Sequence, residues 1–90
     1  MTVEVWNASS KAGLALEVVR SLRDAGFDVV KWGNFASRQK KTFVRDHRGG
    51  SEAAQAVVRS LKTPNAEIFT RLEANPLVDL EVVLGQDYTE

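Results

Sequence analysis

The chain contains one histidine and no cysteine, which leaves few candidates for covalent or metal chemistry. His47 lies beside Asp46, but nucleophilic catalysis also needs a serine or cysteine within reach, and no G-x-S-x-G motif is present. A metal site needs several ligands close together. The acids Asp79, Glu81 and Asp87 are instead spread over a predicted strand and tail, where solvation explains them. We therefore expect no catalytic residue, no metal site and no cofactor, and an exposed His47 at a strand end.

Basic residues are concentrated in one segment, although the formal net charge of the 90 residues is +0. Residues 38–48 contain five cations and one acid: Arg38, Lys40, Lys41, Arg45, Arg48 and Asp46. Residues 67–90 contain six acids and one cation, so charge is divided along the chain. The basic segment is either a solvated loop or a contact for a phosphate-bearing or otherwise anionic polymer. The neutral total gives no global field that favours nucleic acid or a membrane surface.

A polar loop over residues 7–13 is the third candidate. It contains Asn7, Ser9, Ser10 and Lys11 between a predicted strand and a predicted helix. Helix N–H groups together with a lysine attract anions, but serine is also a common N-cap. The loop has neither the G-x-x-x-x-G-K-[ST] nor the G-x-G-x-x-G pattern. It is therefore either a small anion site or a capping loop.

Patterns of apolar residues predict the elements that position these candidates. Residues 3–6 alternate as in a half-buried strand, and residues 14–22 carry an apolar stripe at helical spacing that ends before Gly26. Further elements are expected as strands at 27–32, 42–47, 66–72 and 78–84, and as a second helix between Ser51 and Pro64. Turns are predicted at two dipeptides, Gly33-Asn34 and Asn75-Pro76.

The resulting order of elements, βαββαββ, is typical of an α+β domain. We expect a two-layer α/β sandwich of the ferredoxin-like βαββαβ(β) type, with both helices on one face of a mostly antiparallel sheet. The other face would then carry Trp6 and Trp32, with Phe43 and Arg45 beside them. Such exposed aromatics form a ligand platform or a dimer interface, unless another segment of the chain covers them. Residues 1–90 are expected to form a single domain.

Several motifs together resemble one known family. Residues 7–15, NASSKAGLA, match its pattern N-G-[ST]-G-x-x-G-L-A in register, with Ala8 and Ser10 at positions that are often glycine. Residues 82–88, VVLGQDY, are similar to its closing V-V-L-G-x-D-Y, and Gly26-Phe27 fits the intervening pattern. Over nearly its whole length, the chain thus resembles the C-terminal domain of LytR/CpsA/Psr-type cell-envelope proteins, the LytR C-terminal domain family.

This resemblance implies an accessory domain rather than an enzyme. Full-length proteins of this type are membrane-anchored and face the cell wall. A separate domain, which this chain lacks, transfers lipid-linked anionic glycopolymers to peptidoglycan. We therefore expect an extracytoplasmic location in the cell envelope, for a domain cut from a longer chain that touches the membrane only through an anchor. A cytoplasmic location is the alternative.

Three functions are compatible with these observations. The first is binding of a cell-wall glycopolymer or an envelope protein, through the predicted binding residues Trp6, Trp32, Phe43, Arg38, Lys40, Lys41 and Arg45. The second is self-association as a homodimer through a sheet edge or the uncovered sheet face. The third is binding of single-stranded RNA on sheet aromatics. The segment KKTFVRDHR lacks the spacing of the RNP1 motif, so we expect no nucleic-acid partner.

Overall fold

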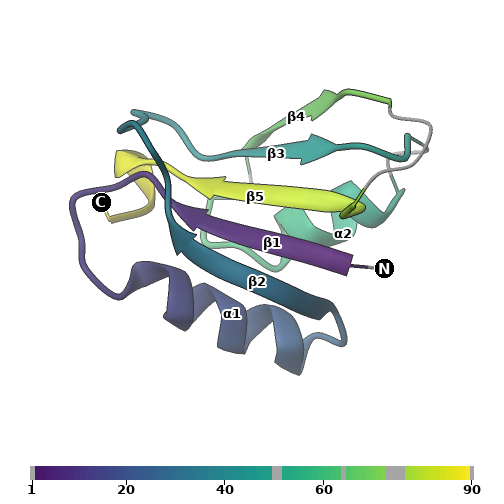
Figure 1. The fold of residues 1–90 in the computed structure, drawn as a ribbon, viewed down its shortest axis with the longest axis horizontal. Coiled ribbons are helices and arrows are strands. Elements are labelled where there is room, and N and C mark those ends of the chain that lie inside the picture. Colours follow the sequence, from purple (N-terminus) through teal and green to yellow (C-terminus); the bar gives the residue numbers. More distant parts are fainter. Residues whose placement is uncertain (1, 50–51, 64, 73–76, 90) are drawn as a thin grey trace.

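The computed structural model describes residues 2–49, 52–63, 65–72 and 77–89, which form a five-stranded sheet with two α-helices (Figure 1). The strands are β1 (Thr2–Asn7), β2 (Asp28–Asn34), β3 (Phe43–Asp46), β4 (Glu67–Thr70) and β5 (Leu80–Leu84). The helices are α1 (Leu14–Asp24), α2 (Glu52–Arg59) and a short 3-10 helix, η1 (Gln86–Thr89). The predicted order of strands and α-helices is confirmed. Ser51 and Pro64, the predicted limits of the second helix, and the predicted turn at Asn75-Pro76 lie outside the described residues.

The strand order is β2-β1-β5-β3-β4, and three of the four neighbouring pairs are parallel. Only β3 and β5 run antiparallel. The prediction of a mostly antiparallel, ferredoxin-like sheet is therefore wrong, although the α+β class holds. The reason is that α1 connects the adjacent strands β1 and β2, and α2 connects the adjacent strands β3 and β4, and such crossovers make neighbouring strands parallel. β5 then joins the two β-α-β units.

The predicted turn at Gly33-Asn34 is also wrong, because these residues are the last two of β2. The chain does not fold back there as a hairpin. It continues through residues 35–42 and enters β3 on the far side of β5. This long connection carries the basic segment across the ends of β1 and β5.

Both α-helices pack on the same face of the sheet and share one core. In Figure 1, α1 runs alongside β1 and β2, and α2 lies behind β3 and β5. The helices bury the apolar residues Leu14, Ala15, Val18, Val19, Leu22, Ala54, Val57 and Val58. The strands contribute Val3, Val5, Val29, Val44, Leu80, Val82 and Leu84. We call the opposite side of the sheet the open face.

The C-terminal end of α1 confirms the predicted role of Gly26, which has a φ of 96°. The N–H of Phe27 donates to the carbonyl of Leu22 at 3.0 Å, and the N–H of Gly26 donates to the carbonyl of Arg23 at 3.0 Å. This pair of hydrogen bonds is a Schellman motif, which favours a glycine in the left-handed conformation just after the helix. The motif turns the chain directly into β2.

Candidate functional site

A bulge in β2 separates the two tryptophans. The register between β1 and β2 shifts at the bulge, so Val30 is an extra residue and is 50% exposed. Trp32 consequently pairs with Val5, a core residue, and lies on the helix side of the sheet edge. Its ring lies 5.1 Å from the guanidinium carbon of Arg23 in α1. The prediction that Trp32 shares the uncovered face with Trp6 is therefore wrong.

Trp6 lies on the open face, as predicted. A Cβ atom built on Gly33 would lie 3.2 Å from the indole ring, so the ring covers this glycine. The indole Nε1 donates a hydrogen bond to Glu4 Oε1 at 3.1 Å. The ammonium of Lys31 lies 5.5 Å from the ring centroid, within the range of a cation–π contact. This end of the open face thus presents an indole beside an exposed lysine.

Further aromatic side chains continue across the open face from Trp6. Val83 of β5 pairs with Trp6 on one side and Phe43 on the other, and it is fully buried although it faces away from the core. The guanidinium of Arg45 lies 5.8 Å from the ring of Phe35 and 5.8 Å from that of Phe43. Both predicted residues, Phe43 and Arg45, therefore lie on the open face, and Phe35 joins them from the loop after β2.

Glu81 lies at the centre of a charged network beside these rings. Its Oε2 atom is 3.2 Å from Arg45 Nη2, and its Oε1 atom contacts His47 Nε2. His47 is only 6% exposed. The predictions of an exposed His47 and of Glu81 as a solvated edge residue are both wrong, because β5 is an inner strand of the sheet. The network neutralises the carboxylate within the fold.

We call residues 35–42, which connect β2 to β3, the basic loop. An open groove of about 550 Å³ adjoins the open face where β3, β4 and the basic loop meet. The rings of Phe43 and Phe69 form an edge-to-face pair on its floor, with centroids 5.7 Å apart. The remaining lining residues are Arg38, Gln39, Lys40, Lys41, Thr42 and Glu67. The groove therefore brings together four of the seven predicted binding residues. It adds Phe69, which the sequence analysis missed because nothing in the sequence places β4 beside β3.

The cations of the groove form no ion pair with the residues that the structure describes. Arg38, Lys40 and Lys41 are all exposed. The ion pairs found within the described part of the chain involve other cations, namely Lys11, Arg45, His47 and Arg48. Glu67 is the one acid that lines the groove among the residues described. An anion entering the groove would therefore meet more positive than negative charge.

The C-terminal segment holds the basic loop in place. The N–H groups of Gln86 and Asp87 donate to the carbonyls of Gln39 and Lys40 at 2.8 and 3.0 Å. Asp87 Oδ1 accepts both the N–H and the hydroxyl of Thr42, at 2.9 and 2.7 Å. The prediction of Asp87 as a solvated tail residue is therefore wrong. The groove's basic side is pre-organised by residues far away in the sequence.

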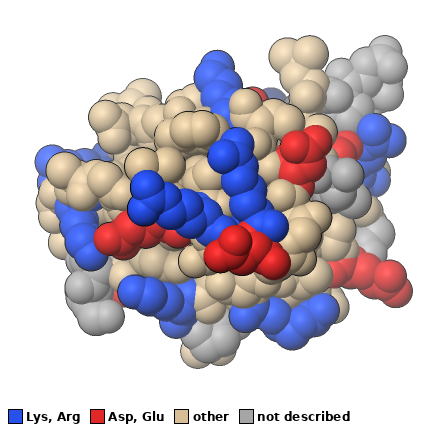
Figure 2. All heavy atoms as spheres, turned by 90° about the horizontal axis from the view of Figure 1, so that it is seen from below, with Lys and Arg blue, Asp and Glu red and all other residues tan. Residues whose placement is uncertain are grey.

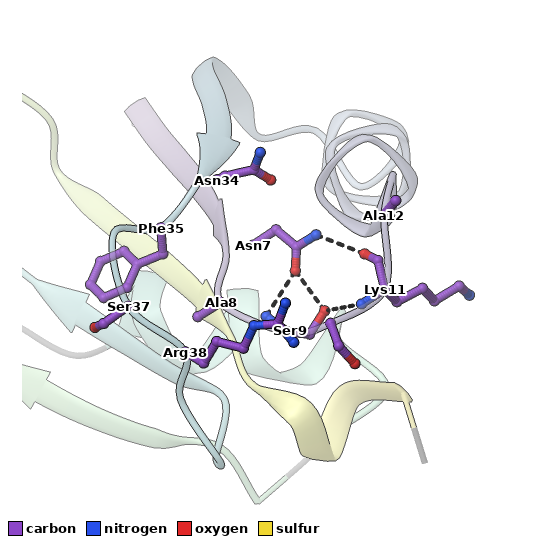
Figure 3. A pocket seen from close by; sticks show the side chains of 10 residues that line it. Asn7, Ala8, Ser9, Lys11, Ala12, Asn34, Phe35, Ser37 and Arg38 are labelled. Carbon is purple, nitrogen blue, oxygen red and sulfur yellow. Dashed lines mark hydrogen bonds between the residues drawn. The ribbon is translucent and has the colours of Figure 1, made fainter.

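The loop after β1 folds around the side chain of Asn7 (Figure 3). Asn7 Oδ1 accepts the N–H and the hydroxyl of Ser9 at 3.0 and 2.6 Å, and Nδ2 donates to the carbonyl of Lys11 at 2.8 Å. The N-cap of α1 is Gly13, with a φ of 81° and no side-chain cap, so the predicted serine cap is wrong. The serines stabilise the loop rather than the helix end.

A pocket of about 250 Å³ beside this loop includes the four residues of the predicted anion site. Ser10 donates its N–H and its hydroxyl to Gln86 Oε1, each at 3.0 Å. The ammonium of Lys11 is 3.7 Å from Glu17, and its side chain points away from Asn7 in Figure 3. Since these polar groups already have partners in the chain, we assign no ligand to this pocket.

The face seen in Figure 2, on the side where α1 lies, has a different charge pattern. Lys and Arg side chains there lie interspersed with Asp and Glu. On such a mixed surface neither positive nor negative charge predominates, so the surface does not favour a polyanion. This contrast distinguishes the groove from the helical side of the domain.

Asp79 and Tyr88 have shifted pKa values that arise from their roles in the fold. The pKa of Asp79 is lowered because its carboxylate accepts the backbone N–H of Thr2 and pairs with Arg48. Burial raises the pKa of Tyr88, whose hydroxyl accepts the N–H of Lys62 at 3.3 Å. Asp79 too was predicted as a solvated acid, which is wrong. Neither residue lines the groove.

Two features are absent from the described residues. None of the helices in residues 2–49, 52–63, 65–72 and 77–89 has the length and apolarity needed to span a bilayer. Within the same ranges, no cluster of three or more His, Cys, Asp or Glu residues is arranged to hold a metal ion.

The mixed sheet with two α-helices on one face defines a small α+β domain. The chain belongs to the LytR C-terminal domain family, whose model, described as LytR cell envelope-related transcriptional attenuator, matches residues 1–88. No curated protein sequence matches the chain.

Two solved structures are similar to this chain. One is the soluble domain, residues 71–217, of a conserved hypothetical secreted protein from Mycobacterium marinum, an orthologue of Rv2700. It is 27% identical with a TM-score of 0.68, and the match covers 97% of this chain and 60% of that one. The other is the C-terminal domain of Rv0431, 28% identical with a TM-score of 0.59, covering 93% of this chain and 70% of that one. The chain thus spans about three-fifths of the Mycobacterium marinum domain.

Proposed function

We propose that this domain is a non-catalytic accessory module of a cell-envelope protein and binds an anionic cell-wall glycopolymer in the groove between β3, β4 and the basic loop. Family membership supports the envelope context. The observation that carries the proposal is the groove itself, where the paired rings of Phe43 and Phe69 lie beside three cations without ion-pair partners in the described chain.

The chemistry of the groove suits a charged sugar chain. Aromatic faces bind the apolar faces of other rings by dispersion and their quadrupole. Lysine and arginine bind phosphate or carboxylate groups through charge-assisted hydrogen bonds. Exposed lysines act as mobile point charges, so they tolerate irregular spacing of anions along a polymer. Because the contacts are exposed, affinity should fall as salt is added.

Co-sedimentation with purified mycobacterial cell-wall sacculi tests the proposal. The unmodified domain should pellet with the sacculi, and the double variant Lys40→Glu/Lys41→Glu should bind at least about tenfold more weakly, a loss of about 1.4 kcal/mol. A matched double variant on the helical side, Arg20→Glu/Lys62→Glu, changes the charge equally and should bind normally. Failure of the unmodified domain to pellet would overturn the proposal, and so would equal loss in both double variants.

Self-association is a second candidate function, favoured by one observation. β2 is an edge strand, and its Val30 and Trp32 are 50% and 42% exposed. Two features act against edge-to-edge pairing: the bulge, and the hydrogen bond from Arg23 to the carbonyl of Val29 at 3.0 Å. Analytical ultracentrifugation distinguishes the two functions, because a domain that is monomeric at all concentrations does not self-associate.

We place the domain on the outer side of the cytoplasmic membrane. This location is supported by its similarity to the soluble domain of a secreted protein. Contact with the membrane would come only through an anchor elsewhere in the parent protein. The location can be tested by replacing an exposed residue, Ser37, with cysteine and treating whole cells with an impermeant thiol reagent. The reagent should label the cysteine. A cysteine that is labelled only after the cells are lysed would contradict the outer location.

A further inference from the structure

β4 is an edge of the sheet that is free to pair with another strand. It lies at the border opposite β2, as Figure 1 shows. Its register with β3 is regular, so it lacks the bulge that interrupts β2. Phe69 at its centre is 49% exposed. Natural sheets often interrupt an edge with a bulge or block it with charge, because a regular edge pairs readily with another strand.

The backbone groups that point outward from β4 belong to Ile68 and Thr70. Arg71 points the other way: its N–H donates to the carbonyl of Asp46 at 2.8 Å, and its carbonyl lies 3.3 Å from His47 Nδ1. Successive residues of a strand direct their backbone groups to opposite sides. Counting back from Arg71, Thr70 and Ile68 therefore direct their N–H and carbonyl groups away from β3.

The side chains of β4 fit a second, antiparallel copy of the same strand. Pairing centred on Phe69 places this residue opposite its own copy, and it places each Glu67 opposite the other copy's Arg71. It also pairs Ile68 with Thr70, whose outward backbone groups then exchange hydrogen bonds. Glu67 and Arg71 are exposed and have no ion-pair partner in the described part of the chain. Because opposite charges meet at both ends of the pairing, the charges of this edge favour a second copy of β4.

The helix side of the same edge also has space for a neighbouring strand. A hollow of about 260 Å³ lies there, lined by Gln55, Val58, Arg59, Ala66 and Ile68. Ile68 packs against the core but is only partly buried. In the antiparallel pair, the other copy's Thr70 lies beside Ile68 on this side of the sheet. Both sides of the edge thus offer apolar surface to a second strand.

We infer that two copies of this domain pair through β4 as an antiparallel, two-fold symmetric dimer, with the two Phe69 rings at the axis between two Glu67–Arg71 ion pairs. The axis is perpendicular to the sheet, so both open faces and both grooves lie on one side of the joined sheet. This dimer does not depend on what the groove binds, and its interface lies on the opposite edge from β2. Because the shared strand is short, we expect a dissociation constant on the order of 100 μM.

Sedimentation equilibrium of the purified domain, without any polymer, tests the pairing. The unmodified domain should dimerise as its concentration rises. Arg71→Glu and Glu67→Arg each bring like charges together twice per dimer, so each should weaken the dimer about tenfold. Arg20→Glu on α1 makes the same charge change as Arg71→Glu and should dimerise normally. An equimolar mixture of Arg71→Glu and Glu67→Arg should recover dimerisation, because opposite charges then meet at both pairs.

A cross-link tests the register of the two strands. The chain contains no cysteine, so a single introduced thiol reports one position. Because the backbone groups of Phe69 point towards β3, the two copies of this residue form a non-hydrogen-bonded pair, with Cα atoms about 4.5 Å apart. That distance is within the range of a disulfide, so mild oxidation should convert Phe69→Cys into a covalent dimer. Val30→Cys, at the 50% exposed position on β2, is the matched control and should cross-link much more slowly.

Three results would overturn the inference. A domain that stays monomeric up to about 1 mM, tenfold above the expected dissociation constant, would assign the edge to a different partner. A dimer that Arg71→Glu and Arg20→Glu affect equally would not involve the Glu67–Arg71 pairs. Faster cross-linking of Val30→Cys than of Phe69→Cys would assign association to β2. None of these measurements includes the polymer, so the proposed function of the groove is tested separately.

Discussion

Gly85 lies against the backbone of Lys41, where a Cβ atom on the glycine would be 2.6 Å from the carbonyl oxygen of Lys41 and 2.8 Å from its nitrogen. The N–H of Gly85 donates to the hydroxyl of Thr42 at 3.0 Å. The close approach explains why the end of β5 needs a residue without a side chain. It also joins the last strand to the base of the basic loop.

Gly85→Ala should therefore destabilise the domain and displace the loop. We expect a loss of about 1–3 kcal/mol in the free energy of unfolding, because backbone atoms cannot move aside easily. Urea denaturation measures this loss. Gly33→Ala is the control, since its new methyl would meet only the side chain of Trp6, at 3.2 Å, and should cost less. An equally stable Gly85→Ala variant would contradict the structure.

Asp79 should make stability depend on acid pH. Hydrogen bonds from Thr2 and the nearby Arg48 lower its pKa below the usual 3.8. The stabilisation is therefore fully present above pH 3.8 and is lost as pH falls through the lower, folded-state pKa. Asp79→Asn should lose on the order of 1.5 kcal/mol at neutral pH. Urea titrations over a pH series should show the free energies of unfolding of the unmodified domain and of Asp79→Asn converging below pH 3.8. A difference that stays constant with pH would contradict this role of Asp79.

Asn7 should stabilise the loop after β1 through its three side-chain hydrogen bonds. Asn7 is only 6% exposed, and Asn7→Ala should cost about 2–3 kcal/mol because the carbonyl of Lys11 and the N–H of Ser9 both lose a partner. Ser9→Ala, which leaves two of the bonds, should cost less. Thermal unfolding gives the loss, and hydrogen exchange should show faster exchange at the Ser9 amide. Unchanged exchange in Asn7→Ala would contradict this role.

The Glu81 network should contribute more than an exposed ion pair. Glu81→Gln leaves Arg45 and His47 without their shared carboxylate, and we expect a loss of about 1–3 kcal/mol. The pair of Lys11 and Glu17, whose side chains are 52% and 56% exposed, is the contrast. Lys11→Gln should cost less than about 0.5 kcal/mol. Chemical denaturation measures the loss in the free energy of unfolding for both variants. Equal losses would show that the partly buried Glu81 network contributes no more than the exposed ion pair.

Local patterns in the sequence determined the elements of this domain. The apolar stripe from Leu14 to Leu22 predicts α1 because helical spacing places those side chains on one side of the helix. Gly26 marks the helix end because few other residues adopt its φ of 96°. Membership of the family was also visible in the sequence, from motifs at both ends of the chain. Each of these conclusions depends on residues close together in the sequence.

Tertiary structure decided which strands are neighbours, and hence which side chains meet. Strand pairing depends on contacts between distant residues, so the order of elements did not reveal that most pairs are parallel. One inserted residue, Val30, moved Trp32 away from Trp6, because each step along a strand reverses the side on which a side chain lies. The inner position of β5 turned Glu81 from a solvated acid into the partly buried partner of Arg45 and His47, and the approach of β4 to β3 built the groove.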